Sequence, residues 1–148
     1  MENGFAEMEM IAEEQLLIDL EAYRNNLTTL NEVESIEVRR LLRIIHEHLF
    51  DSELNVCSLR EWSSMRNHNI SSLFKRETGI AIRDYVERHR MEAAAHVLSV
   101  PHDVSIFTIA CEIGYTSPEA FSRTFKRHFG NTPSRYRESA LQHKRAAA

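Results

Sequence analysis

The sequence has few of the features on which disulfide-rich, zinc-binding and membrane proteins depend. Its two cysteines, Cys57 and Cys111, lie far apart and form no CxxC pair, which excludes a disulfide framework and a paired-cysteine zinc site. No apolar run reaches the roughly 18–20 residues that a membrane span requires, and the acidic start is unlike a signal peptide. We therefore expect a cytoplasmic protein in a reducing compartment, with no membrane contact.

The motifs of common active sites are missing as well. The four glycines form no phosphate-cradling loop, and there is no HExxH sequence. Of the eight histidines, His46 and His48 point in different directions on a helix, whereas His89 and His96 lie about 10.5 Å apart along a helix axis, too far for one ion. We expect no metal, no cofactor and no enzymatic activity.

Charge is distributed unevenly along the chain, although the total of −4 argues at first against a nucleic-acid partner. Residues 1–35 hold nine acidic side chains and one basic, a charge of −8, and residues 36–148 hold thirteen acidic and seventeen basic, a charge of +4. An acidic leader thus precedes a basic domain, a pattern typical of proteins that approach phosphates.

Apolar residues recur at helical spacing almost throughout, which predicts an all-α chain. The predicted core helices are marked by Val38 to Leu49, by Leu59, Trp62 and Met65, by Ile70 to Phe74, by Ile82 to Leu98 and by Ile106 to Ile113. The last of these begins after a Ser105 cap, and the next starts at Ser117-Pro118, a typical helix start. Trp62 and the phenylalanines, including the Phe121, Phe125, Phe129 stripe, are expected in the core.

One short unit occurs twice. Phe74-Lys75-Arg76 is followed by Gly79 and Tyr85, and 51 residues later Phe125-Lys126-Arg127 is followed by Gly130 and Tyr136. Both glycines are placed to end a helix in the left-handed conformation. Because each copy follows a segment that reads as helix, turn and helix, we predict two similar units joined by a rigid helix over Ile82–Leu98.

The second unit resembles the signature of the AraC/XylS-type transcription regulators. The matching residues are Ile109-Ala110, Glu112, Gly114-Tyr115, Ser117, Phe121-Ser122-Arg123, Phe125-Lys126-Arg127, Phe129-Gly130, Pro133 and Tyr136-Arg137. The similarity extends back through Leu73-Phe74-Lys75-Arg76, Thr78-Gly79, Tyr85 and Arg90, so it covers roughly residues 38–138. It implies about seven helices, with two helix-turn-helix subdomains joined by a linker helix, that bind double-stranded DNA to regulate transcription.

The resemblance also implies which residues meet DNA. Base contacts are expected from Glu119, Ser122 and Arg123 in the second unit and from His68, Ser71 and Ser72 in the first. Arg123 is the strongest candidate because an arginine can pair with both acceptors of a guanine edge; the alternative is an exposed ion pair with Glu119. Backbone contacts are expected from Ser117, Lys126, Arg127, Lys75 and Arg76, unless the charged ones are only solvated surface residues.

The first unit departs from the pattern. Arg60 and Ser64 stand where the second unit has Ala110 and Gly114, which predicts a wider helix crossing or a shifted helix. Arg66 stands where the AraC/XylS-type family usually has a capping serine, although the neighbouring Asn67 can cap the helix instead. We expect weaker or non-specific contacts from this unit, where the polar residues are as consistent with a solvated face as with base contacts.

The expected domains are residues 1–35, an acidic amphipathic leader; residues 36–140, the double helix-turn-helix domain; and residues 141–148, a tail. In the leader, apolar residues at 16, 20, 23, 27 and 30 form one helical stripe. It can dock on the chain's own domain or pair with a partner, and we expect a homodimer or partner contact through residues 8–33. RNA polymerase is a second candidate partner.

Two functional classes stay open at this point. One is a DNA-binding transcription regulator whose second unit dominates the reading of bases. The other is a helical adaptor that kept the fold but binds protein through the leader or the altered first unit. The steep salt dependence of DNA binding is the observation that separates them.

Overall fold

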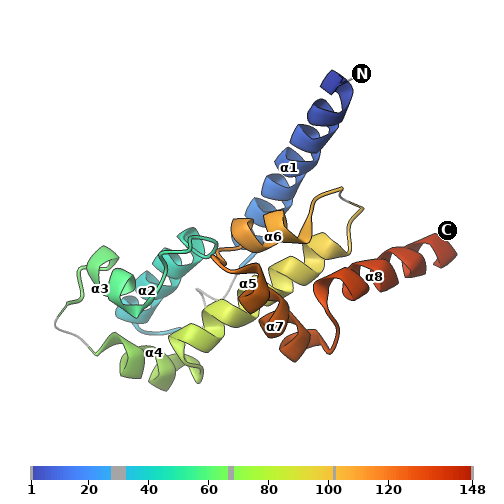
Figure 1. Cartoon of the computed structure of the whole chain (residues 1–148). Coiled ribbons are helices and arrows are strands. Elements are labelled where there is room, and N and C mark those ends of the chain that lie inside the picture. The colour runs from blue at the N-terminus through green and yellow to red at the C-terminus, as the bar shows by residue number, and fades with distance from the viewer. Residues whose placement is uncertain (1, 28–32, 67–68, 102, 148) are drawn as a thin grey trace.

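The computed structural model describes residues 2–27, 33–66, 69–101 and 103–147, all of them in helices or connecting segments. The elements are α1 (Glu2–Asn25), α2 (Ile36–Glu47), α3 (Val56–Trp62), α4 (Ile70–Thr78), α5 (Ile82–Leu98), α6 (Ile106–Glu112), α7 (Pro118–Phe129) and α8 (Pro133–Ala147). Figure 1 shows α5 between a group formed by α2, α3 and α4 and a group formed by α6, α7 and α8. The all-α prediction, with seven helices after an N-terminal one, is confirmed.

The first group builds its own core on one face of α2. Ser35 caps this helix by accepting a hydrogen bond from the Val38 N–H at 3.3 Å. The buried α2 residues then pack with Leu59, Ile70 and Phe74 from α3 and α4. Trp62, predicted in this core, is instead 37% exposed and stacks on His48 with ring centroids 4.2 Å apart. Trp62 is the last residue of α3, and its stacking partner His48 is the C-cap of α2, so the ring lies at the helix ends and not in the core.

The linker helix α5 belongs to both cores. Its first half contributes Ile82, Tyr85 and Val86 to the first core, and its second half contributes Met91 and the Ala93–Leu98 segment to the second. Tyr85 also meets the buried His46, whose Nε2 lies 2.6 Å from the phenol oxygen. Because one continuous helix carries buried side chains of both groups, the two units are held at a fixed separation.

The second core surrounds α7. Phe121 and Phe125 are fully buried, and Phe129 packs beside Tyr136 of α8 with ring centroids 5.5 Å apart. Phe5 of α1 and Phe107 of α6 are exceptions to the predicted burial of the phenylalanines, since both are exposed. The last helix, α8, continues to Ala147 and so includes residues 141–147.

The leader helix docks on the chain's own domain. Leu16 and Leu20 are buried in the second core, and the Tyr23 hydroxyl donates to Glu92 Oε2 at 3.0 Å and lies 3.0 Å from Nδ1 of His89. Burial is the main cause that raises the pKa of Tyr23. Leu27 packs against the first core, and residue 30 lies outside the described residues. The sequence leaves two alternatives open for this stripe and favours contact with a partner. That preference is wrong for the stripe, because it packs against the chain's own domain.

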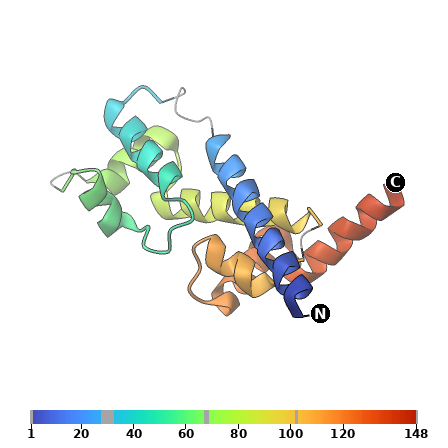
Figure 2. The ribbon, with the colours of Figure 1, turned by 90° about the horizontal axis from the view of Figure 1, so that it is seen from above.

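The opposite face of α1 is open. Met8, Ile11 and Ile18 are exposed there at helical spacing, and Figure 2 shows α1 crossing α5 with its N-terminal end extending past it. A homodimer through residues 8–33 stays a prediction, and it now depends on this open face. In the part of the chain that the structure describes, no helix combines the length and apolarity needed to cross a bilayer.

Candidate nucleic-acid interface

The second helix-turn-helix unit consists of α6 and α7, and local signals define its start and end. The Ser117 hydroxyl accepts a hydrogen bond from the Ala120 N–H at 3.2 Å, and Pro118 occupies the first helical position. Gly130 ends α7 with φ of 78°, as Gly79 ends α4 with the same angle. These caps are those expected from the sequence, and the burial of Phe121 and Phe125 sets which side of α7 faces outward.

The outward side of α7 presents the predicted contact residues. Glu119, Arg123 and Lys126 are exposed, and Ser122 is half-buried beside them. The pKa of Glu119 is lowered chiefly by its own backbone N–H and by the Ser117 hydroxyl, which donates at 3.0 Å, with a smaller contribution from Arg123. No salt bridge joins Glu119 to Arg123, although both side chains are described. The Arg123 guanidinium therefore forms no direct salt bridge with Glu119, although its charge still acts on that carboxylate.

Arg127 is engaged differently from its neighbours. Its Nη2 donates to Glu87 Oε1 of α5 at 2.6 Å, and Nε2 of His128 lies 2.8 Å from the same oxygen. Burial acts to raise the pKa of Glu87, but the hydrogen bonds from His128 and Arg127 outweigh it and lower that pKa. This cluster ties α7 to the linker helix, and Glu87 is a residue that sequence reasoning missed, because a contact across 40 residues leaves no local signal.

The first unit, α3 and α4, starts its second helix late. Asn69 caps α4 by accepting from the Ser72 N–H at 3.2 Å, whereas Asn67, the possible substitute cap, lies outside the described residues. By the 51-residue repeat, Ser117 corresponds to Arg66, which has no side-chain oxygen for a helix N–H, and the next suitable acceptor after the undescribed residues is Asn69. Consequently α4 has 9 residues where α7 has 12.

The predicted contact residues of the first unit are only partly placed. Ser71 and Ser72 are exposed in the first turn of α4, and Lys75 and Arg76 are exposed one turn later. His68 lies outside the described residues. The outward face of α4 is therefore polar and accessible.

The turn between α3 and α4 matches that of the second unit despite the substitutions. Ser64 adopts φ of 58°, the left-handed region in which Gly114 has φ of 97°. The Met65 N–H donates to the Arg60 carbonyl at 3.1 Å, as the Tyr115 N–H donates to the Ala110 carbonyl at 2.9 Å. The two units thus share the local geometry of this turn, because Ser64 adopts, at a cost in backbone strain, a left-handed conformation that glycine adopts freely. The wider helix crossing or shifted helix stays a prediction.

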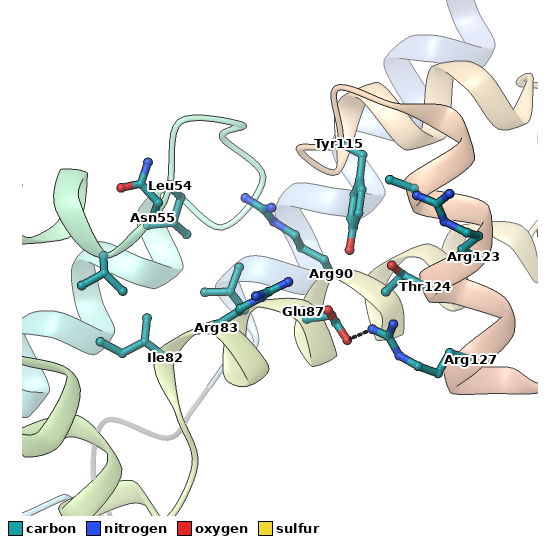
Figure 3. A pocket seen from close by; sticks show the side chains of 13 residues that line it. Leu54, Asn55, Ile82, Arg83, Glu87, Arg90, Tyr115, Arg123, Thr124 and Arg127 are labelled. Atoms are coloured by element: carbon teal, nitrogen blue, oxygen red, sulfur yellow. Dashed lines mark hydrogen bonds and ion pairs between the residues drawn. The ribbon is translucent and has the colours of Figure 1, made fainter.

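A cleft of about 600 Å³ separates the two units along α5 (Figure 3). The segment Leu54–Val56 forms one wall, the α7 residues Ala120, Arg123, Thr124 and Arg127 form the other, and α5 forms the floor. Arg90 in the floor donates to the carbonyls of Leu49 and Asp51, both at 2.7 Å. Burial lowers the pKa of Arg90, which stays a cation beneath the Tyr115 ring at 6.0 Å.

Comparison with known proteins identifies this architecture. A family model described as a helix-turn-helix domain matches residues 63–139. The regulatory protein SoxS of Escherichia coli is 34% identical over 100 residues, which are 68% of this chain and 92% of SoxS. The chain belongs to the AraC-type family of DNA-binding transcription regulators.

Other AraC-type proteins extend the likeness. The DNA-binding domain of AdpA, solved in complex with a target DNA, matches with a TM-score of 0.64 and 25% identity over 77% of this chain and 100% of that chain. The uncharacterized transcriptional regulatory protein YesN of Bacillus subtilis is 34% identical over 70% of this chain, which spans only 28% of YesN. The family and its two-unit helical fold, expected from the repeat and the signature, are confirmed.

Proposed function

We propose that this protein regulates transcription by reading two adjacent major-groove segments of duplex DNA with α4 and α7. The observation that carries the proposal is the pair of capped, outward-facing helices held by one continuous linker. A helix fits the major groove, and successive major-groove segments on one face of the duplex recur about 34 Å apart. Of the two functions that the sequence left open, the relatives favour the regulator.

The second unit is the dominant reader in this proposal. Its helix α7 is longer than α4, and its Arg123 is exposed without an ion-pair partner among the described residues. Arg123 is assigned to a guanine edge, with Glu119 and Ser122 beside it. In the first unit, Ser71 and Ser72 offer shorter side chains from a shorter helix, so they contribute less discrimination between bases.

Positive side chains around both helices are assigned to the DNA backbone. Lys126, Lys75 and Arg76 are exposed and are assigned to phosphates, with Ser117 at the α7 N-terminus. Arg127 is assigned to phosphate as well. It keeps its salt bridge with Glu87 in that role, because 64% of its side chain is exposed beside the pair. These contacts supply affinity without sequence preference.

The test is selection of binding sites from a random duplex pool at physiological salt, followed by Arg123→Ala on the selected site. We expect a defined consensus, a loss of about 1–3 kcal/mol for Arg123→Ala, and relaxed preference at one base position. Arg88→Ala is the matched control, because Arg88 is exposed on α5 but does not line the cleft. Binding without any consensus, or a consensus untouched by Arg123→Ala, contradicts the proposal.

A further inference from the structure

The cleft between the two units holds positive charge that the fold does not use. Four arginines line it, and two of them are occupied: Arg90 binds the carbonyls of Leu49 and Asp51, and Arg127 binds Glu87. The single carboxylate in the cleft, Glu87, forms a salt bridge with Arg127. The cleft therefore carries an excess of positive charge, and two of its arginines have no protein partner among the described residues.

Those two arginines are Arg83 and Arg123. Arg83 is exposed in the first turn of α5, near the first unit, and Arg123 is exposed on α7 in the second. Neither forms a hydrogen bond or salt bridge with another residue that the structure describes. Figure 3 shows both side chains at the cleft, which they approach from different elements.

The position of the cleft points to its ligand. When two helices enter adjacent major-groove segments, the sugar-phosphate strands that border the intervening minor groove pass between them. The floor of the cleft is the helix that joins the two units, and its walls come from both. A backbone phosphate between the half-sites thus faces the cleft, where a guanidinium provides planar donors for phosphate oxygens.

We propose that the cleft between the units is a phosphate site for the DNA backbone between the two half-sites, with Arg83 as its principal ligand. This inference depends on the proposed binding by α4 and α7. Arg123 reads a base from one wall, whereas Arg83 contacts the spacer backbone, whatever its sequence. The linker helix then takes part in binding in addition to setting the spacing.

The first experiment measures the dissociation constant of the selected duplex over a salt series for the wild type, Arg83→Gln and Arg88→Gln. Loss of one phosphate contact should weaken binding about eightfold near 0.1 M salt and reduce the slope of log K against log salt by about 0.9. Arg88→Gln removes the same charge from the opposite side of α5 and should leave affinity and slope close to those of the wild type. Arg83→Lys keeps the charge and should restore the slope.

The second experiment replaces single phosphates between the half-sites with neutral methylphosphonate linkages. At one or two adjacent positions, the neutral linkage should weaken wild-type binding by the same factor as the Arg83→Gln substitution does. At those positions it should not weaken binding by the Arg83→Gln variant any further. Equal losses for both proteins at every linkage, or equal salt slopes for wild type and Arg83→Gln, overturn the phosphate site. If Arg123→Ala still relaxes the base preference in that case, the proposed function stands and only this inference fails.

Discussion

Gly114→Ala is the substitution for which the structure makes the sharpest stability prediction. Gly114 lies in the turn between α6 and α7 with φ of 97°. A Cβ at this position would lie 2.9 Å from Cζ and Nη2 of Arg90 and 3.0 Å from the Phe50 carbonyl oxygen. Arg90 cannot withdraw without breaking its two hydrogen bonds to the segment between α2 and α3.

Two costs add at Gly114. An alanine in the left-handed region costs about 1–2 kcal/mol. Loss of at least one of the two hydrogen bonds from the partly buried Arg90 guanidinium costs about 1.5–3 kcal/mol more. We therefore expect Gly114→Ala to lower the free energy of unfolding by about 2.5–5 kcal/mol, and to loosen the contact between the second unit's turn and the first unit.

Gly79 and Gly130 are matched controls. Both have φ of 78°, and nothing lies within 4 Å of a Cβ built on either. Alanine at these positions should incur only the backbone cost, about 1–2 kcal/mol. Urea unfolding followed by circular dichroism measures all three variants. A Gly114→Ala cost no larger than that of Gly79→Ala would refute the steric role of Arg90.

Two further predictions concern stability. Ser64→Gly should raise the free energy of unfolding by about 1 kcal/mol in the same urea assay, because Ser64 is an exposed non-glycine residue with φ of 58°; a loss of stability contradicts this. Burial lowers the pKa of His46 to about 4, from about 6.5 in the unfolded chain. Between these values the unfolded chain binds more protons than the folded one. The stability that neutral His46 contributes is therefore complete above pH 6.5, and as the pH falls towards 4 the free energy of unfolding decreases by about 3 kcal/mol in all. His46→Gln should reduce the pH dependence of unfolding between pH 4 and 7, and an unchanged profile speaks against it; His89, whose pKa burial also lowers, adds a slope of the same sign.

The parts of the fold that depend on local chemistry were predictable from the sequence. Ser117 with Pro118 starts α7, and the glycines at 79 and 130 end α4 and α7, because capping and left-handed turns depend on a few adjacent residues. The helical spacing of apolar residues identified the buried faces for the same reason.

The parts that depend on contacts between distant segments were not predictable. The Glu87 cluster joins α5 to α7, and the leader stripe is covered by the chain's own second core, facts that no local pattern encodes. The late start of α4 is an intermediate case. The missing serine was visible in the sequence, but two nearby asparagines were available as caps and only the structure shows Asn69 in use.

Base contacts also lie beyond the sequence. Exposure of Arg123 and its lack of an ion-pair partner among the described residues make it available to DNA, but discrimination between bases depends on the geometry of the complex. The spacing of α4 and α7, in contrast, follows directly from the linker helix α5 and the two cores that it joins.

The spacing experiment tests the central claim most directly. Affinity is measured for the selected duplex and for the same duplex with about five base pairs inserted between its half-sites, half of a helical turn. If α4 and α7 read the duplex together, the original duplex should be bound far more tightly, and the lengthened one should be reduced to the affinity of a single half-site. Equal affinity for the two duplexes would contradict simultaneous reading by α4 and α7.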